Sequence, residues 1–425
     1  TTRAAGIVVT DDTADRDPTE SGRVIQEKCA VVLRLAPSFF RFGSFEIFKP
    51  TDSYSGDSGS SHGLENEMMP AMLEFTLNYF PQVKQLEKEK GLSKDETYLE
   101  MFRASVKETA RTIALWQCYG FCHGVLNTDN MSVFGLTIDF GPFGWMDYFN
   151  KKFICNHSDQ HGRYSYENQP EIGKWDLIKF AEALQSHLPL DKTKEIVEKE
   201  YYPTYEEHYY GKMREKLGLF LNKDEDKQLI DEFFDVLHEN ASDMTTTFRK
   251  LTIVGVSENT EEAITEKVVQ EFAGLSPSKD TLALRYAPDY TESQIQRIKQ
   301  IAQTNMQLLM VMGFSPKIIE EQEEKIKQQK EIMDLSEEQM AKNIQGRWEK
   351  WLKKYHERIV TEVKTAVEES KFESPEDFQA FRVKKMNSVN PVYVIRNYMA
   401  EEAIRKAEKG DYSGVNNLLD LLLNP

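Results

Sequence analysis

The chain has 425 residues, of which 70 are Asp or Glu and 53 are Lys or Arg, so its formal net charge is −17. This acidic balance argues against broad binding to nucleic acid or to anionic membranes, although it permits a local basic pocket. The length suffices for about two or three hydrophobic cores, and a hydrophobic content of 40% is typical of a folded globular protein. The longest apolar runs are short, so we expect no membrane-spanning segment.

The cysteine count and the first residues bear on compartment and processing. Four cysteines are too few for a disulfide framework, so a reducing or mixed compartment fits best. The chain opens on TTRAAGIVVTDD, which lacks the charged and apolar regions of a signal peptide. Such an opening is typical of the middle of a domain, and we therefore expect the chain to be a fragment or a processed product.

Two segments near the start are rich in β-branched residues. Residues 5–10 (AGIVVT) and 29–36 (CAVVLRLA) predict a β-hairpin that crosses a charged loop at 11–27. The second segment leads into RLAPSFFRFGSFE, which places Arg34 and Arg41 seven residues apart. Arginine side chains bind phosphate groups through paired N–H donors, but two such arginines taken alone are more often ordinary surface residues.

Helices dominate the chain after a loop predicted at 51–63, a stretch rich in Ser, Gly and Asp that we expect to be mobile. Ser93 and Glu96 have the spacing of a capping box, and Gly120 can end the helix behind them. Residues 320–331 are nearly all charged or amide residues, which indicates a solvated helix face, with a partner-binding helix as the alternative. Further amphipathic segments and helix starts are predicted at 174–188, 205–219, 224–240, Thr291, Ser336 and Ser374.

Residues 123–141 (HGVLNTDNMSVFGLTIDFG) resemble the phosphate-handling core of a protein kinase. A kinase catalytic loop has the spacing H-x-D-x-x-x-x-N, and a strand that ends in Asp-Phe-Gly follows it. His123 and Asn130 keep this spacing, and Asp139 begins an Asp-Phe-Gly tripeptide. The position of the catalytic aspartate, however, is Val125, and the interval between Asn130 and Asp139 is shorter than in kinases.

The residues that remain can still handle a nucleotide. Asn130 and Asp139 offer an amide and a carboxylate oxygen, the hard ligands that Mg²⁺ takes beside phosphate oxygens. We therefore predict that these two residues hold Mg²⁺. The carboxylate of Asp129 can accept the proton of an attacking hydroxyl group, and we predict that it replaces the base lost at Val125.

Two clusters with cysteine suggest other chemistry. Cys118, Cys122 and His123 resemble a metal-binding trio, but their place at a predicted helix end favours burial in the core. The segment 155–161 favours an ordered segment like a kinase activation loop, and a zinc site is the alternative interpretation. Its candidate ligands are Cys155, His157, Asp159 and His161.

Four blocks of the sequence together resemble the selenoprotein O family, whose members are also called YdiU-like. The blocks are RLAPSFFRFGSFE, HGVLNTDNMSVFGLTIDFGPFGWMD, CNHSDQHGRYSYENQP and NPVYVIRNYMAEEAIRKAEKGD, and they span nearly the whole chain. The resemblance implies an α+β, mostly helical, protein-kinase-like fold that is classed as a pseudokinase. Residues 1–50 would be the remainder of the N-lobe, 51–272 the C-lobe with its catalytic and metal-binding loops, and 273–425 a C-terminal helical extension.

The resemblance also implies an activity and its residues. The family is one of protein adenylyltransferases, which transfer AMP from ATP to Ser, Thr or Tyr hydroxyl groups of proteins and bind the nucleotide flipped relative to kinases. By this resemblance Asp129 is the catalytic proton acceptor, Asn130 and Asp139 hold Mg²⁺, and Arg34, Arg41 and Asp139 bind the nucleotide. The implied partners are ATP and protein substrates, without nucleic acid or membrane, and the implied location is mitochondrial, with the cytoplasm as the alternative.

The family pattern includes parts that this sequence does not contain. A Gly-rich segment, an ion-pairing Lys and its partner Glu would precede Thr1, and a Cys or selenocysteine would follow Pro425. We therefore expect a chain truncated at both ends that binds ATP poorly and is inactive by itself, with no redox partner for Cys155. Because Val125 replaces the usual base, the alternative function is a catalytically inactive pseudokinase that acts as a nucleotide-binding or scaffold module.

Overall fold

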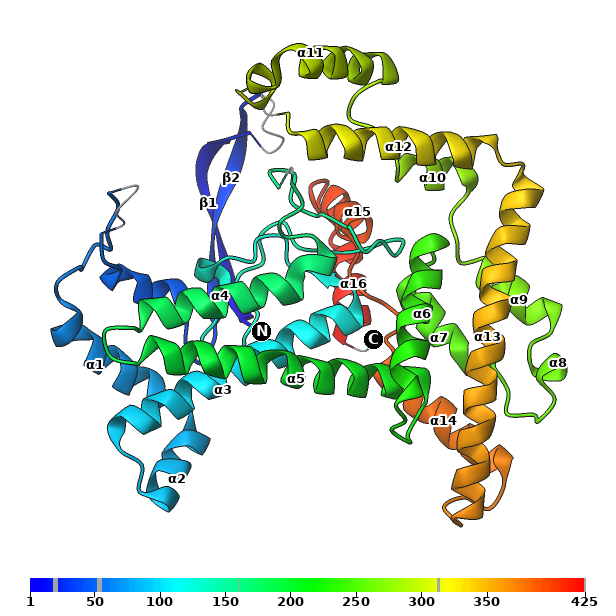
Figure 1. Cartoon of the computed structure of the whole chain (residues 1–425), viewed down its shortest axis with the longest axis horizontal. Coiled ribbons are helices and arrows are strands. Elements are labelled where there is room, and N and C mark those ends of the chain that lie inside the picture. The colour runs from blue at the N-terminus through cyan, green and yellow to red at the C-terminus, as the bar shows by residue number, and fades with distance from the viewer. Residues whose placement is uncertain (18–21, 52–55, 160, 312–313, 424–425) are drawn as a thin grey trace. The chain divides into compact units, whose positions relative to one another are not determined.

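The computed structural model describes residues 1–17, 22–51, 56–159, 161–311 and 314–423. Most of this part of the chain is helical and the strands are few, as the sequence predicted (Figure 1). The chain forms two compact units, one of residues 1–144 and 152–212 and the other of residues 145–151 and 213–425. The division into lobes at 1–50, 51–272 and 273–425 stays a prediction.

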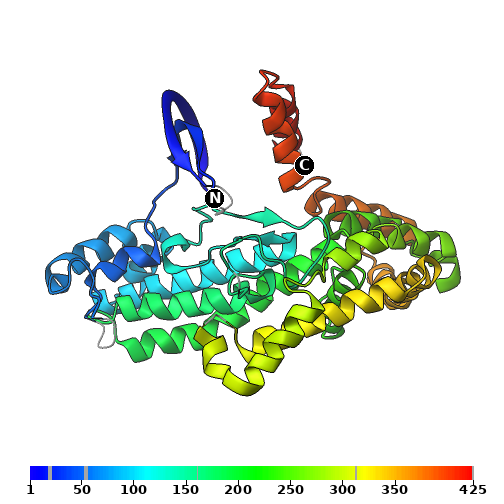
Figure 2. The ribbon, with the colours of Figure 1, turned by 90° about the horizontal axis from the view of Figure 1, so that it is seen from above.

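The first unit begins with the predicted hairpin, whose long strands Figure 2 shows in dark blue. Strand β1 (Arg3–Arg16) pairs antiparallel with β2 (Ile25–Leu35), with Val8 opposite Val31. The expected loop at 11–27 is wrong in its extent, because the charged residues up to Arg16 continue the strand and pair with residues of β2. Backbone pairing therefore outweighs the weak strand propensity of these charged side chains.

Helices α1 (Glu65–Leu77), α2 (Pro81–Lys90), α3 (Lys94–Tyr119), α4 (Gln169–Ala183) and α5 (Leu190–Leu217) follow. The predicted capping box is confirmed, since the Ser93 hydroxyl accepts from the Glu96 N–H and the Glu96 carboxylate accepts from the Ser93 N–H at 2.8 Å. Gly120 ends α3 with a φ of 70°, a left-handed conformation that glycine adopts readily. Of the predicted loop at 51–63, residues 52–55 lie outside the described residues.

An aromatic cluster forms the centre of the first unit. The rings of Phe42 and Phe180 stack with centroids 4.7 Å apart, and Phe45 and Phe102 also contact Phe180. Phe42 and Phe45 belong to the 3-10 helix η1 (Phe42–Phe48), Phe102 to α3 and Phe180 to α4. Aromatic packing therefore fixes η1 against two long helices.

The segment between α3 and α4 contains short elements only. They are β3 (Phe121–Cys122), η2 (Thr128–Asn130), β4 (Gly144–Trp145) and η3 (Tyr166–Asn168). The strand or hairpin predicted after Asn130 is reduced to an isolated β-bridge between Met131 and Thr137.

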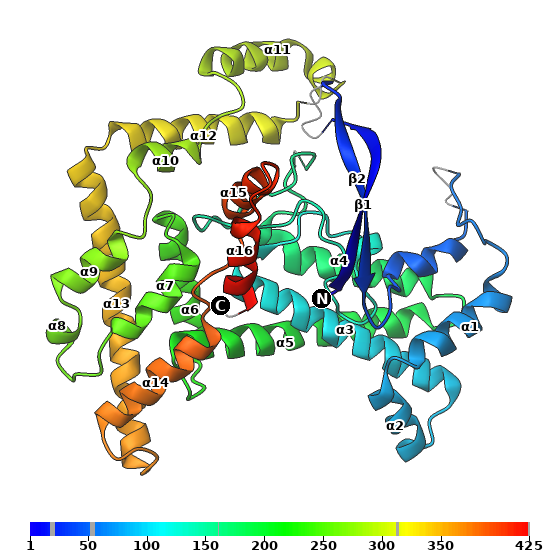
Figure 3. The same cartoon turned by 180° about the vertical axis from the view of Figure 1, so that it is seen from behind.

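The second unit is built on α13 (Glu337–Glu368), which begins at the predicted capping box of Ser336 and packs against α6, α9 and α14 (Figure 3). The charged residues 320–331 lie in α12, which contacts α10 and α11 and pairs Lys325 with Asp289 at 3.0 Å. Among the helices that the structure describes, none is both long and apolar enough to cross a membrane. The other elements of this unit are α6 (Glu225–Glu239), α7 (Met244–Lys250), η4 (Leu251–Ile253), α8 (Thr260–Ala263), α9 (Glu266–Ala273), α10 (Lys279–Leu284), α11 (Glu292–Val311), α12 (Pro316–Asp334), α14 (Pro375–Val389), α15 (Asn397–Ala407) and α16 (Ser413–Leu423).

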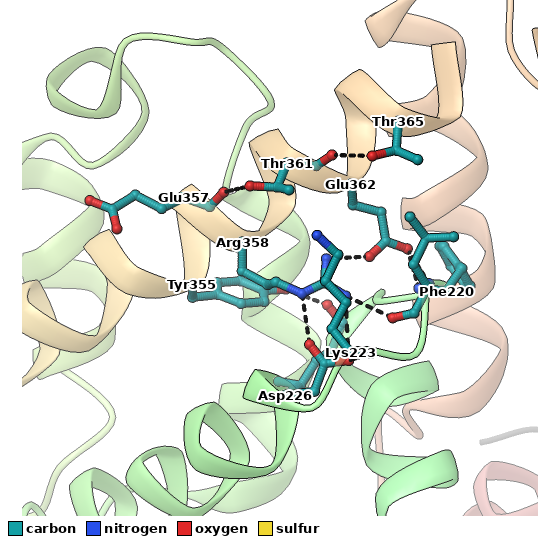
Figure 4. Close-up of polar contacts among 11 residues, drawn as sticks. Phe220, Lys223, Asp226, Tyr355, Glu357, Arg358, Thr361, Glu362 and Thr365 are labelled. Atoms are coloured by element: carbon teal, nitrogen blue, oxygen red, sulfur yellow. Dashed lines mark hydrogen bonds and ion pairs between the residues drawn. The ribbon is translucent and has the colours of Figure 1, made fainter. Parts of the chain in front are cut away.

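A buried ion network fastens α13 to the start of α6 (Figure 4). Arg358 donates to Asp226 at 2.7 Å and to Glu362 at 2.6 Å, and Glu362 also accepts from the Leu221 N–H at 2.8 Å. The three charged side chains are at most 4% exposed. Because each charge is buried, loss of one partner leaves the others without compensation.

We expect Arg358→Met to lower the free energy of unfolding by about 3–5 kcal/mol, because it leaves two buried carboxylates unpaired. The measurement is urea unfolding followed by circular dichroism. Lys353→Met is the matched control, since it breaks the exposed pair with Glu349 on the same helix, and we expect it to change stability by less than about 1 kcal/mol. Equal effects of the two variants would contradict the prediction.

A buried carboxyl group on α4 gives the first unit a pH-dependent stability. Asp176 is fully buried, and neither of its carboxyl oxygens has a hydrogen-bond partner among the described residues. Burial raises the pKa of Asp176 to about 8, although the charge of Arg163 opposes the shift. The group therefore keeps its proton in the folded state at a pH where the unfolded chain releases it.

We expect Asp176→Asn to stabilise the protein increasingly as pH rises from about 4 to about 8. In this window the wild-type folded state binds more protons than the unfolded state, so its stability falls with pH, and asparagine removes that dependence. Above about pH 8 the gain should level off at a few kcal/mol, since each unit of pKa difference corresponds to about 1.4 kcal/mol. Unfolding measured at several pH values checks this, and a gain that is constant with pH would contradict it.

Candidate functional site

Backbone pairing brings the segment after β2 to the segment after η2. The Phe42 N–H donates to the Met131 carbonyl at 3.0 Å, and the Val133 N–H donates to the Phe40 carbonyl at 3.2 Å. Arg41 forms an antiparallel β-bridge with Ser132. This pairing places Arg41 beside the stretch that ends in Asp-Phe-Gly.

Asp139 is bonded to both predicted arginines. Arg34 Nη1 donates to Asp139 Oδ1 at 3.1 Å and to the Ile138 carbonyl at 2.6 Å. Arg41 donates to Asp139 Oδ2 through Nε at 3.0 Å and through Nη2 at 2.6 Å. The structure therefore brings together three of the five predicted site residues, and each carboxylate oxygen of Asp139 faces an arginine.

The pKa values of Asp139 and His123 are both lowered, so Asp139 is negatively charged and His123 is neutral at neutral pH. Burial alone would raise the pKa of Asp139, but the hydrogen bonds from Arg41 and Arg34 outweigh it and lower that pKa. Burial lowers the pKa of His123 to about 4, so its imidazole is neutral at neutral pH. The His123 Nδ1 accepts from the Val125 N–H at 3.4 Å, which assigns the ring proton to Nε2.

The other two predicted residues, Asp129 and Asn130, lie on η2. Asn130 Nδ2 donates to the Val125 carbonyl at 2.8 Å, which leaves its amide oxygen as an acceptor. Asp129 is exposed, and its carboxylate makes no hydrogen bond or ion pair with another described residue. In the part of the chain that the structure describes, neither residue hydrogen-bonds to Asp139.

A glycine that the sequence reasoning missed supports Asp129. A Cβ atom added at Gly43 would lie 2.1 Å from Asp129 Oδ1 and 3.4 Å from its Cα. Because the aromatic cluster holds η1 in place, glycine alone leaves room for the carboxylate. The only sequence signal is a Gly-Ser pair between two phenylalanines in RFGSF, which by itself does not indicate a site.

The segment after Lys152 lies against the same loop. Asn156 Nδ2 donates to the Gly124 carbonyl at 3.1 Å, and Cys155 Sγ donates to the Cys122 carbonyl at 3.5 Å. Asp159 accepts from the N–H groups of two residues farther along, which closes the segment into a turn. The activation-loop-like character of this segment stays a prediction, and Gln160 lies outside the described residues.

The two cysteine clusters show no metal-binding geometry in the part of the chain that the structure describes. Among the described residues, no three His, Cys, Asp or Glu side chains come together as a metal-binding group. Cys118 and Cys122 are fully buried, as predicted, although Cys122 lies in β3 rather than at a helix end. A hydrogen bond from the Cys122 thiol lowers the pKa of Cys155.

Comparisons with known proteins show which family and which proteins this chain is similar to. A family model described as "Protein adenylyltransferase SelO" matches residues 1–423. The chain is 39% identical to the mitochondrial protein adenylyltransferase SelO-1 of Danio rerio and 38% identical to the mitochondrial protein adenylyltransferase SelO of Homo sapiens, with 100% of this chain and 60% and 62% of those proteins covered. It is 32% identical to the protein nucleotidyltransferase YdiU of Pseudomonas fluorescens (strain Pf0-1), with 94% of this chain and 60% of that protein covered. The chain thus spans somewhat over half the length of the relatives that it matches.

Proposed function

The chain belongs to the SelO family of protein adenylyltransferases, and from that membership we propose that it is part of an enzyme that transfers AMP from ATP to Ser, Thr or Tyr hydroxyl groups of proteins. The observation that carries this proposal is the cluster of Arg34, Arg41 and Asp139, of which Asp139 lies on the chain segment that follows the exposed Asp129. We propose a kinase-like fold as the framework, with residues 1–50, 51–272 and 273–425 as its N-lobe remainder, C-lobe and helical extension.

Arg34 and Arg41 are proposed to bind the phosphate groups of ATP. Some of their N–H groups donate to Asp139, namely Nη1 of Arg34 and Nε and Nη2 of Arg41. Phosphate oxygens accept the same bidentate hydrogen bonds as a carboxylate. Asp139 therefore keeps the two guanidinium groups oriented until a nucleotide takes over part of their donors. In a protein with a net charge of −17, this placement supplies the local positive charge that a triphosphate needs.

Asn130 and Asp139 are proposed to hold Mg²⁺. The donor set fits, because the Asn130 amide nitrogen donates to the Val125 carbonyl while its oxygen accepts no hydrogen bond from another described residue, and because Asp139 is ionised. A magnesium ion held there would supply positive charge that neutralises the phosphates and the leaving group.

Asp129 is proposed to act as the general base. Val125 has no group that accepts a proton, whereas the Asp129 carboxylate is exposed and makes no hydrogen bond or ion pair with another described residue. In the proposed reaction the hydroxyl oxygen of the protein substrate attacks the α-phosphorus, and its proton passes to Asp129. The bond between the α-phosphorus and the bridging oxygen breaks, and pyrophosphate leaves. This geometry requires the flipped nucleotide, with the α-phosphate rather than the γ-phosphate beside Asp129.

A second candidate is a catalytically inactive pseudokinase, which Val125 at the usual base position favours. In that case ATP would bind at the arginines without transfer of any group. The Danio rerio and Homo sapiens relatives are named as mitochondrial, and we propose the same location for this protein.

We expect the full-length protein to transfer label to protein from ATP labelled at the α-phosphate and not at the γ-phosphate. Asp129→Asn should lower this transfer by about 100-fold or more, because an amide cannot accept the proton, while ATP binding is retained. Asp95→Asn on the first turn of α3 is the matched control and should retain full transfer. Transfer of the γ-label alone would indicate an ordinary kinase, and ATP binding without transfer would favour the pseudokinase.

We expect Gly43→Ala to lower AMP transfer by about tenfold to 100-fold, because the new methyl group displaces the Asp129 carboxylate and small misplacements of a catalytic group reduce rates strongly. The measurement is kcat for AMP transfer in the full-length protein. Gly211→Ala on α5 is the control, since a Cβ there meets no atom within 4 Å. Equal rates in the two variants would show that Asp129 does not depend on Gly43.

A further inference from the structure

Apart from the two-residue strand β3, which pairs with β4, the backbone that leads to Asp129 is held by side chains. Four of the five carbonyl groups from residue 121 to residue 125 accept a side-chain hydrogen bond. The donors, in the order of the carbonyls at 121, 122, 124 and 125, are Gln169, Cys155, Asn156 and Asn130. The loop therefore takes its shape from a few hydrogen bonds whose donors can be changed one at a time.

Gln169 makes two of the contacts to this backbone. Its Nε2 donates to the Phe121 carbonyl at 2.9 Å, and its Oε1 accepts from the His123 N–H at 2.8 Å. Gln169 is fully buried and is the first residue of α4. Because the aromatic cluster around Phe180 holds α4 in the core, the amide is a fixed point to which the loop is attached on both sides of Cys122.

The geometry assigns a role to this contact: we infer that Gln169 is a positioning residue for AMP transfer, whose amide fixes the loop backbone that orients Asn130 and Asp129. The inference rests on the proposed function. Gln169 itself touches neither nucleotide nor substrate in this proposal and acts through the loop.

The path from Gln169 to the catalytic side chains runs through adjacent residues. After His123 the chain turns at Gly124, whose φ is 82° and whose absent Cβ would lie 2.7 Å from Cys155 Sγ, so the turn has little freedom to shift. The next carbonyl, that of Val125, orients the Asn130 amide at 2.8 Å. A displacement of residues 121–123 is therefore passed to the predicted magnesium ligand and to its neighbour Asp129.

The amide is suited to this contact because it donates and accepts at the same time. An ionised carboxylate of the same shape accepts from the His123 N–H but repels the Phe121 carbonyl. A protonated carboxyl group restores both hydrogen bonds, since its O–H replaces the amide N–H. With Gln169→Glu, both hydrogen bonds therefore form at low pH, and the one to the Phe121 carbonyl is lost at high pH.

The experiment compares AMP transfer by the full-length wild type and by Gln169→Glu from low to high pH, with α-labelled ATP. Burial raises the pKa of the introduced carboxyl group. We expect kcat of the variant to approach the wild-type value at low pH and to fall by about tenfold or more as the carboxyl group ionises, in line with the effect of misplaced catalytic groups. The KM for ATP should change less than kcat does, since Arg34 and Arg41, which are proposed to bind the phosphate groups, lie outside the loop.

Two further variants separate positioning from a general effect of burial. Gln117→Glu places a carboxyl group at another buried amide, which donates to the Tyr166 carbonyl at 2.7 Å. Among the described residues its side chain makes no hydrogen bond to residues 121–125, so the variant should keep the wild-type pH profile of kcat. Gln169→Leu removes both hydrogen bonds and should lower kcat at every pH. Circular dichroism at each pH gives the folded fraction, to which the rates are normalised.

The inference is overturned, while the proposed function stands, if kcat of Gln169→Glu has the wild-type pH profile. It is also overturned if the loss of AMP transfer follows the loss of folded protein. The same holds if Gln117→Glu shows the identical pH-dependent loss. If the full-length wild type transfers no AMP, the proposed function fails and the inference falls with it.

Discussion

The bonds that two arginines form with one carboxylate organise the candidate site. Arg34 and Arg41 lie 105 and 98 residues before Asp139 in the sequence, yet both reach its oxygens. Without this ion cluster, two guanidinium groups would repel each other across a half-buried space, and the Asp139 carboxylate would be desolvated without compensation. The cluster therefore joins the segment that leaves the hairpin to the segment that contains Asp-Phe-Gly, and it sets the charge that any ligand of this region meets.

Support for the cluster comes from apolar packing beneath it. The stacked rings of Phe42 and Phe180 fix η1 on α4, and η1 contains Gly43, against which Asp129 lies. The start of the same helix α4 contributes Gln169, which holds the loop before Asp129. One helix thus supports the site at two points, and its position depends on aromatic burial rather than on any polar contact at the site itself.

In the second unit, a buried ion network rather than aromatic packing connects two helices. Arg358 and the two carboxylates that it contacts are almost fully buried on α13 and α6, where replacement by apolar residues of equal volume can be neutral for stability. The polar network has the directional hydrogen bonds that an apolar cluster lacks, because Glu362 also binds the backbone N–H of Leu221. We interpret it as a contact that fixes which part of α13 meets the loop before α6.

The sequence by itself determined what depends on neighbours in the chain. The capping boxes at Ser93 and Ser336 predicted the starts of α3 and α13, and β-branched runs predicted the hairpin, although the strand extends to Arg16 and shortens the expected loop. The spacing of His123, Asn130 and Asp139, together with four sequence blocks, indicated the family, which the comparisons confirmed. Only the tertiary structure decided that Arg34 and Arg41 meet Asp139, that Gly43 makes room for Asp129 and that Gln169 holds the loop. These contacts join residues far apart in the sequence, so packing of the whole unit, rather than local propensity or periodicity, determines which side chains meet.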